Sequence, residues 1–226
     1  VNGTNNKVHT AFEEGHSIWY FRAFDYVGVD RETGAAQFRN HEGKIVASSE
    51  LTDEDMTDIG SAIPKFTYGI TLNLEYKGFD FTAFGTGVAG NKIFNILYRA
   101  DSPLRNSLKY YMDNAWTPEN KGASMPAVNN VATDLNFWSS SAAMFNGSYF
   151  KIKQLQLGYT LPKRLTQKVA IKDLRFFVSL DDFFTFSNYP GMDPETATTG
   201  NNGGAGFDIG SYPTMKKCSF GASFSF

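Results

Sequence analysis

Three glycines follow a run of alternating residues and have a spacing that could cradle a phosphate. The stretch "GTGVAG" (Gly85, Gly87, Gly90) matches the GxGxxG pattern of dinucleotide-binding loops. That chemistry requires a buried parallel strand before the loop, and such a strand is a continuous apolar run. The residues before Gly85 alternate instead, so we interpret the glycines as places where the backbone is closely approached at a strand end.

An acidic stretch, "LTDEDMTD", could bind calcium through its carboxylates, which are Asp53, Glu54, Asp55 and Asp58. It lacks the spacing and the glycine of an EF-hand loop, so a solvated acidic loop is the better interpretation. The surrounding segment 29–65 has eight acidic and four basic side chains, a net charge of −4. We expect a partner that docks there to present a basic or polar face.

Other arrangements that support catalysis or metal binding are missing from the sequence. The three histidines, His9, His16 and His41, do not have HExxH-type spacing, and the single Cys218 excludes a cysteine-rich metal site. No Ser/His/Asp set has supporting context. The sequence therefore predicts that the protein is not an enzyme and uses no cofactor or metal.

The composition narrows the class further. The 226 residues carry a net charge of −2, which does not favour nucleic acid as a partner. The chain contains 21 Phe and 11 Tyr, yet mean hydropathy is −0.31, so apolar residues are spaced out. No apolar run reaches the roughly 18 residues of a transmembrane helix. The chain starts at Val1 without a signal peptide, so we expect it to be processed, trimmed or part of a larger gene product.

Alternation with a period of two dominates the sequence and predicts β-strands. In "FTYGITLNLEYK", the even positions 66–76 are apolar and the odd positions are polar or glycine. Gly78 then permits a tight turn. In "SYFKIKQLQLGYTLP" the apolar parity changes near Lys153, which a β-bulge there would explain; alternatively, its first part lies beyond the apolar environment. We expect six strands, at about 17–27, 66–77, 79–88, 149–161, 174–186 and 217–226.

The connections between these strands are very unequal in length. The turn at Gly78 and the connection 162–173 are short, whereas 29–65, 89–148 and 187–213 are long. Such loops are uncommon in a compact soluble domain but typical of an outer-membrane barrel, whose periplasmic turns are short and external loops long. If the C-terminus is periplasmic, counting strands backwards places all three long loops outside.

Six strands are too few to close a membrane barrel, which needs about eight. The fold class we predict is therefore all-β, with residues 1–226 forming the C-terminal strands of a larger antiparallel transmembrane β-barrel. The rest of that barrel would lie outside this chain. Trp116 and Trp138 fall in the 89–148 loop. They are candidates for contacts with cargo or a partner, although packing within the loop would also explain them.

Five motifs, in order, resemble the C-terminal part of SusC/RagA-type TonB-linked outer-membrane transporters, and they cover the chain from about Glu14 onward. They are "IPKFTYGITLNLEYKGFDFTAFGTGVAGNKIFN", "WTPEN", "GSYFKIKQLQLGYTLP", "FFTFSNYPGMDPE" and "YPTMKKCSFGASFSF". One departure is Asp182, where the family usually has Asn; we attach no function to it.

The resemblance implies a 22-stranded barrel filled by an N-terminal plug, with a TonB box through which TonB opens the plug. It also implies a SusD-like surface lipoprotein that captures oligosaccharide or peptide cargo. Neither plug nor TonB box is present in this sequence, so this chain alone is not expected to transport. The terminal Phe224 and Phe226 resemble the signal read by barrel-assembly machinery, and their strand is expected to face membrane lipid.

Two other classes compete with this interpretation. A soluble, aromatic-rich carbohydrate-binding β module would explain the Trp and Tyr content. It would not explain a terminal phenylalanine or loops that are long on one side only. An outer-membrane enzyme would need a catalytic set, which the sequence does not show.

Overall fold

The computed structural model of the chain describes residues 7–96, 109–131, 133–166, 171–198 and 205–226. The chain forms two compact units. The sheet unit consists of Phe66–Ala89, Ser148–Ser187 and Pro213–Phe226. The loop unit consists of Val1–Lys65, Gly90–Gly147 and Asn188–Tyr212. The two units therefore alternate along the chain.

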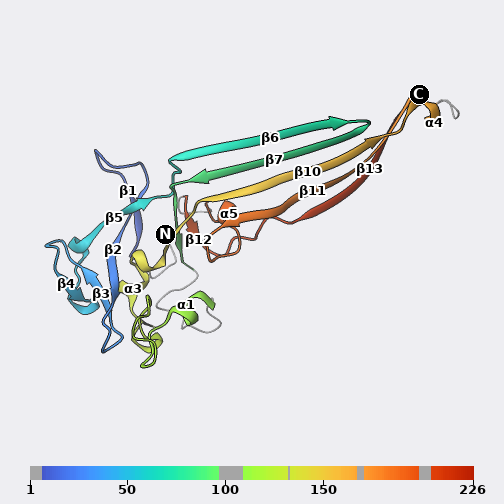
Figure 1. Cartoon of the computed structure of the whole chain (residues 1–226). Coiled ribbons are helices and arrows are strands. Elements are labelled where there is room, and N and C mark those ends of the chain that lie inside the picture. Colours follow the sequence, from blue (N-terminus) through green and yellow to red (C-terminus); the bar gives the residue numbers. More distant parts are fainter. Residues whose placement is uncertain (1–6, 97–108, 132, 167–170, 199–204) are drawn as a thin grey trace. The chain divides into compact units, whose positions relative to one another are not determined.

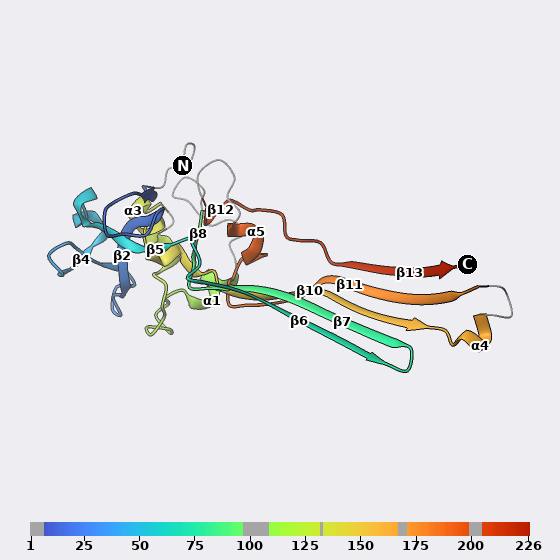
Figure 2. The same cartoon turned by 90° about the horizontal axis from the view of Figure 1, so that it is seen from above.

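The sheet unit is a five-stranded antiparallel sheet in the order β13-β11-β10-β7-β6 (Figures 1 and 2). Its strands are β6 (Phe66–Tyr76), β7 (Phe79–Ala89), β10 (Tyr149–Thr160), β11 (Asp173–Ser187) and β13 (Lys217–Ser225). The short helix α4 (Lys163–Thr166) follows β10. The short connections, at Lys77–Gly78 and 161–172, leave one end of the sheet, and all longer connections leave the other. The predicted inequality of the connections is confirmed.

The register of the five strands places most apolar residues of each strand on one common face; Phe84, Val88 and Phe177 lie on the other. Directly paired residues share a face of a sheet, and the pairs that link all five strands include Leu72 with Ala83 and Leu157 with Val178. The resulting apolar face consists of positions 66, 68, 70, 72, 74 and 76; 79, 81, 83, 85, 87 and 89; 150, 152, 155, 157 and 159; 174, 176, 178, 180, 184 and 186; and 218, 220, 222 and 224.

A β-bulge at Lys153 keeps β10 in phase with its neighbours. The register shifts between Ile152 and Gln154 in both pairings of this strand. An extra residue in a strand changes the parity of everything beyond it. The bulge therefore returns Leu155 to the same face as Ile152, and the predicted bulge is confirmed.

The glycines of "GTGVAG" lie beneath aromatic rings of neighbouring strands. A Cβ on Gly85 would lie 2.5 Å from Cζ of Phe150, and one on Gly87 would lie 2.5 Å from Cζ of Tyr68. Glycines covered in this way by cross-strand aromatics are a known device for holding strands in register. The strand β8 (Lys92–Asn95), not a helix, follows the motif. This arrangement agrees with the close-approach interpretation and not with a nucleotide loop.

The strand expected at 17–27 does not belong to this sheet, so the sheet has five of the six expected strands. Strand β2 (Tyr20–Val29) lies in the loop unit, where it pairs with β1, β3 and β5. Phe21, Ala23 and Phe24 are fully buried there, so neighbouring positions on both sides of the strand face protein. A strand buried on both faces does not show the apolar–polar alternation of a half-exposed strand.

The loop unit contains small sheets and short helices. The strands β1 to β5 form one sheet, and β12, β8 and β9 form a second. Among the described residues, no helix is long and apolar enough to cross a membrane. Besides β2 and β8, the elements are β1 (His9–Ala11), β3 (Ala36–Arg39), β4 (Ile45–Ala47), β5 (Met56–Ser61), β9 (Met144–Asn146), β12 (Phe207–Asp208), α1 (Lys109–Asn114), α2 (Val128–Val131), α3 (Leu135–Trp138), α5 (Pro194–Thr198) and the 3₁₀ turns Ser48–Glu50, Asp53–Asp55 and Ser141–Ala143.

The loop unit has an apolar core of its own. Trp138 lies at its centre, 1% exposed, and its Nε1 donates a hydrogen bond to the carbonyl of Val131 at 2.7 Å. Its ring packs edge-on against Phe137 and Tyr111, with centroid distances of 4.9 and 5.4 Å. A smaller cluster contains Phe21, Phe94 and Phe207. Segments of the long connections therefore bury apolar surface of their own.

A glycine- and asparagine-rich stretch occupies residues 196–208. Its residues 199–204 lie outside the described part of the chain. On either side of them, Ala197 and Phe207 are buried, at 1% and 4% exposure. Both of these residues therefore belong to the core of the loop unit.

We predict that Trp138→Ala destabilises the loop unit by about 3–5 kcal/mol, because a large buried side chain leaves a cavity when it is truncated. The measurement is the urea concentration at which this unit becomes cleavable by trypsin in the purified full-length protein. Trp116→Ala is the matched control and should cost much less, since Trp116 is only half-buried. Equal destabilisation by the two substitutions would contradict the core assignment.

Candidate functional site: a sheet with one apolar and one polar face

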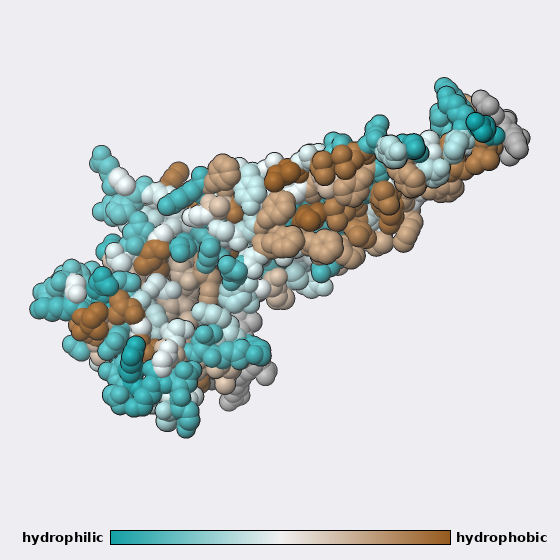
Figure 3. Space-filling model, in the orientation of Figure 1, coloured by the Kyte–Doolittle hydropathy of each residue, from teal (hydrophilic) through white to brown (hydrophobic). Residues whose placement is uncertain are grey.

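The apolar face of the sheet leaves large hydrophobic side chains without protein cover. Ile70 is 59% exposed, Phe186 58% and Phe220 82%. Figure 3 shows apolar side chains gathered over these strands, whereas the surface of the loop unit is largely hydrophilic. Contiguous apolar surface of this extent is rare on a protein surrounded by water and marks contact with another apolar phase.

Aromatic side chains border the apolar face at both ends. At the end where the long connections leave, Phe66, Tyr68, Phe150 and Phe186 stack in a row across the strands, with centroid distances of 5.6, 5.9 and 6.4 Å. At the turn end lie Tyr76 and the pair of Phe79 and Tyr159, whose centroids are 4.5 Å apart. Such girdles mark the two interfaces of a lipid bilayer.

The spacing of these two aromatic rows fits a bilayer. Phe66 and Tyr76 are ten residues apart along β6, which corresponds to about 34 Å at the usual rise per residue. A strand tilted by about 40° then rises about 26 Å, close to the height of roughly 25 Å of the apolar band of membrane barrels. The residues between the rows on β6 are aliphatic: Ile70, Leu72 and Leu74.

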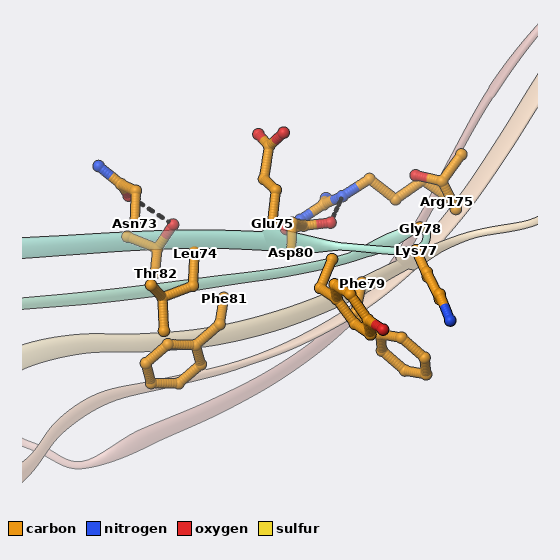
Figure 4. Close-up of a pocket in the computed structure, with 12 residues that line it drawn as sticks. Asn73, Leu74, Glu75, Lys77, Gly78, Phe79, Asp80, Phe81, Thr82 and Arg175 are labelled. Carbon is orange, nitrogen blue, oxygen red and sulfur yellow. Dashed lines mark hydrogen bonds and ion pairs between the residues drawn. The ribbon is translucent and has the colours of Figure 1, made fainter.

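The opposite face of the sheet is polar and hollowed near the turn at Gly78 (Figure 4). Arg175 on β11 binds Asp80 on β7 through two hydrogen bonds, of 2.8 Å from Nε and 2.5 Å from Nη2. Gly158 of the intervening strand permits this, since a Cβ there would collide with both side chains. The Arg175 guanidinium also stacks over Phe177, 5.1 Å from the ring centroid. Two parallel hydrogen bonds between the planar guanidinium and the carboxylate fix the orientation of the two side chains relative to each other.

Sequence reasoning missed this ion pair. Asp80 and Arg175 are separated by 95 positions, and no local pattern links them. The alternation in the sequence does place both residues on the polar faces of their predicted strands. It does not show that they are neighbours. Only the strand register does so, by pairing Asp80 with Gly158 and Arg175 with Thr160.

A second ion pair lies at the bulge. Lys153 Nζ and Asp182 Oδ1 are 3.0 Å apart, with 25% and 17% of their side chains exposed. Asp182 has a positive φ of 56°, a conformation that Asp tolerates better than most residues. The two irregular residues of neighbouring strands are thus joined. This contact accounts for Asp182 structurally and adds no functional role.

Three carboxylates of the acidic stretch 53–58 contact basic side chains of the same chain. Asp53 binds Lys7 Nζ at 3.1 Å, and Asp58 binds Nδ1 of His16 at 2.8 Å. Among the described residues, no cluster of three or more carboxylate, imidazole or thiol groups could hold a metal ion. The expectation of a partner with a basic or polar face at this segment stays a prediction.

Asp55 is the buried member of the stretch, at 5% exposure. It accepts hydrogen bonds from the backbone N–H groups of His41 and Thr52 at 2.9 and 2.8 Å, and from His41 Nδ1 at 2.6 Å. The two backbone donors, followed by these side chains, hold the pKa of Asp55 well below its usual range. In turn, the hydrogen bond to Asp55 raises the pKa of His41.

The two tryptophans predicted as contacts differ in the structure. Trp138 is a core residue, so the expectation that its side chain contacts cargo or a partner is wrong, and the alternative of packing within the loop is confirmed for it. Trp116 is half-buried and donates a hydrogen bond from Nε1 to the carbonyl of Arg31 at 3.0 Å. Its ring lies over Gly34. It keeps an accessible edge and remains a candidate.

Phe224 and Phe226 are 60% and 85% exposed, and their rings meet edge-on at 5.6 Å. Phe224 pairs with Leu174 across the sheet and therefore lies on the apolar face, as predicted. Whether assembly machinery reads these two residues stays a prediction.

A sheet whose strands turn lipid-compatible side chains one way and polar side chains the other is a section of the wall of a transmembrane β-barrel. The section is open. Its outermost strands, β6 and β13, each pair with one strand only in the described sheet.

Comparison with known proteins identifies the class of barrel protein that the chain resembles. The chain is 30% identical over 236 aligned residues to TonB-dependent receptor P3 of Formosa agariphila, covering 94% of this chain. It is 25% identical to TonB-dependent receptor P26 of the same organism over 85% of this chain. The alignments cover 22% and 20% of these relatives, so the chain spans about a fifth of their length. No family model matches the chain.

Solved structures agree on the fold. The RagAB peptide transporter superposes on all of this chain with a TM-score of 0.77 at 24% identity, using 24% of its own chain. The RagAB peptide importer in its closed-closed state gives a TM-score of 0.72 at 22% identity over 97% of this chain and 25% of that one.

These similarities agree with the predicted resemblance to TonB-linked transporters of the SusC/RagA type, and the sheet unit is a section of the wall of an outer-membrane β-barrel. These relatives are named receptors and transporters, in agreement with the prediction that the protein is not an enzyme.

We predict that Leu72→Arg costs about 2–4 kcal/mol of folding free energy in lipid, because Leu72 lies midway between the aromatic rows on the apolar face. Asn73→Arg, one position along the same strand, should cost far less, since Asn73 lies on the polar face, where its side chain bonds Thr82 at 3.0 Å. The measurement is urea unfolding of the full-length protein in lipid vesicles. Equal costs for the two substitutions would contradict the assignment of the faces.

A second prediction concerns pH. The pKa of His41 is raised in the folded protein, so the protonated side chain stabilises the loop unit. This contribution is complete below pH 6.5, the ordinary histidine pKa, and disappears as the pH rises through the raised pKa. The pKa of Asp55 is lowered in the folded protein, so its carboxylate also stabilises the loop unit. This contribution is complete above pH 3.8, the ordinary pKa of Asp, and is lost as the pH falls through the lowered pKa. The resistance of wild type to trypsin, relative to His41→Gln, should therefore be greatest between about pH 4 and 6.5. If the resistance of wild type relative to His41→Gln instead increased above pH 8, the pairing of His41 with Asp55 would be contradicted.

Proposed function

We propose that the chain is part of a TonB-dependent importer of the outer membrane, in which the sheet unit is a section of the barrel wall. The observation that carries this proposal is the apolar face between two aromatic rows, since the spacing of the rows matches the two interfaces of a bilayer. The similarity to TonB-dependent receptors over most of the chain supports the coupling to TonB.

The rest of the barrel and the plug are the partners that this proposal requires first. The unpaired edges of β6 and β13 present rows of backbone N–H and C=O groups, which in lipid must be bonded by further strands. We take TonB to act through an N-terminal part of the protein that this chain does not contain. In this proposal residues 1–226 are the C-terminal portion of the barrel, and Phe224 and Phe226 guide its assembly.

The loop unit supplies the surface outside the membrane. Its own core makes it a stable platform, and in this proposal a SusD-like lipoprotein docks there and delivers an oligosaccharide or a peptide. Trp116 is our candidate contact, because it combines an exposed edge with a fixed backbone. The similarity to RagAB, a peptide transporter, supports a peptide as one of the two cargo classes.

A soluble carbohydrate-binding module is the alternative function. Such a module would bury the apolar face of its sheet against a second layer. In the described sheet unit, Leu74 and Phe224 remain more than half exposed on that face. This observation favours the barrel wall.

The test is a strain that lacks the gene for the whole protein, complemented with wild type or with variants. We expect the deletion to abolish growth on one oligosaccharide or peptide source, and deletion of tonB to abolish the same growth. The tagged protein should fractionate with outer membranes and co-purify a lipoprotein. Normal growth of the deletion strain on every glycan and peptide source tested would contradict the import function.

The docking contact is tested in the same strain with Trp116→Ala. Trp19→Ala is the matched control, because Trp19 is also an exposed tryptophan of the loop unit, at 43%. We expect less lipoprotein to co-purify with Trp116→Ala than with Trp19→Ala at equal amounts of folded receptor. Equal recovery would remove Trp116 from the docking surface and leave the import function intact.

A further inference from the structure

A hollow of about 530 Å³ in the loop unit has no role in the wall or in the core. Strand β1, strand β2 and the acidic stretch 53–58 contribute its sides. Its lining is strongly charged and of mixed sign, with one apolar residue among them: Lys7, His9, Arg22, Asp53, Glu54 and Met56.

Arg22 supplies an unused cation to this hollow. It pairs with His9 across β1 and β2, so the two side chains share a face of the sheet. Its Nε donates to the carbonyl of Met56 at 3.3 Å, which holds the guanidinium toward β5. Its two terminal nitrogens make no hydrogen bond or ion pair with any described residue. A planar guanidinium held in this way is a ready donor pair for a carboxylate.

Glu54 supplies an unused anion. Asp53, Asp55 and Asp58 each have a partner of the same chain, in Lys7, His41 and His16. Glu54 is exposed and makes no hydrogen bond or ion pair with a residue that the structure describes. The hollow therefore contains one positive and one negative group that are not neutralised by the described residues of the chain.

We propose that this hollow binds a zwitterionic ligand of the peptide class, with its carboxylate on Arg22 and its ammonium on Glu54. The proposal rests on the import function above and selects peptides from the two cargo classes. A simple anion would be repelled by Glu54 and a simple cation by Arg22, whereas a free peptide or amino acid satisfies both. A neutral sugar leaves both charges without a counter-charge. Met56, the apolar residue of the lining, is 7% exposed and contacts the apolar part of the ligand.

The probe is trialanine with free ends, titrated calorimetrically into the purified full-length receptor in detergent. Its C-amide and its N-acetyl derivative each remove one charge. We expect each modification to weaken binding by about 10-fold to 100-fold, the usual effect of losing a charge-assisted hydrogen bond. Dialanine and tetra-alanine then report the separation of the two subsites.

Variants locate the effect in this hollow. In Arg22→Gln, amidation of the peptide should no longer matter, while acetylation still weakens binding. In Glu54→Gln, the reverse should hold. Lys44→Gln is the matched control, because Lys44 bonds Glu42 at 2.8 Å elsewhere in the loop unit. It should behave as wild type with all three peptides.

Several results would overturn the proposal. These are absence of trialanine binding at millimolar concentration, equal affinity for free and blocked peptides, or modification effects that persist unchanged in both variants. None of these outcomes affects the import function, which is measured by TonB-dependent growth. Conversely, selective binding that follows both variants would stand even if no growth phenotype were found.

Discussion

Backbone hydrogen bonding in a medium without water is the constraint on which the sheet unit depends. Each peptide group in the hydrocarbon layer has to be paired within the protein, and paired strands do this along their whole length. The five strands pair with one another as antiparallel ladders. Once the ladder is fixed, side chains must alternate between its two faces. One set of positions then meets lipid and the other meets the polar interior. The alternation of apolar and polar residues in the strands is therefore a consequence of the backbone hydrogen bonding.

The irregular places in the sheet preserve that alternation. The bulge at Lys153 adds one residue to β10, and the positive φ of Asp182 marks the matching irregularity on β11. Without the bulge, the apolar residues in one half of β10 would turn to the polar face of the sheet. The ion pair between these two side chains offsets the cost of placing charged residues there. Rings over Gly85 and Gly87, and Arg175 across Gly158, show that glycine serves this sheet by letting neighbours lie close to its backbone.

The loop unit obeys the rules of a protein in water. Many of its aromatic residues are buried around Trp138, and three carboxylates of its acidic stretch contact lysine or histidine. The chain alternates between segments in lipid and segments in water, and the two kinds of segment are arranged differently. The sheet unit has apolar side chains on its outer surface, whereas the loop unit has them in its interior. The mean hydropathy of −0.31 averages these two and describes neither.

The sequence alone determined the features that depend on local periodicity. These are the alternation of the five sheet strands, the change of parity near Lys153 and the end of the sheet from which long loops leave, because a period of two can be followed residue by residue. The structure then chose the bulge over the other explanation of that change. Tertiary structure decided the rest. Strand β2 and Trp138 are buried by residues far away in the chain, and Arg22 and Glu54 come together only when β2 and the acidic stretch fold into one unit. Burial and pairing at long range depend on which segments meet, and no local pattern records that.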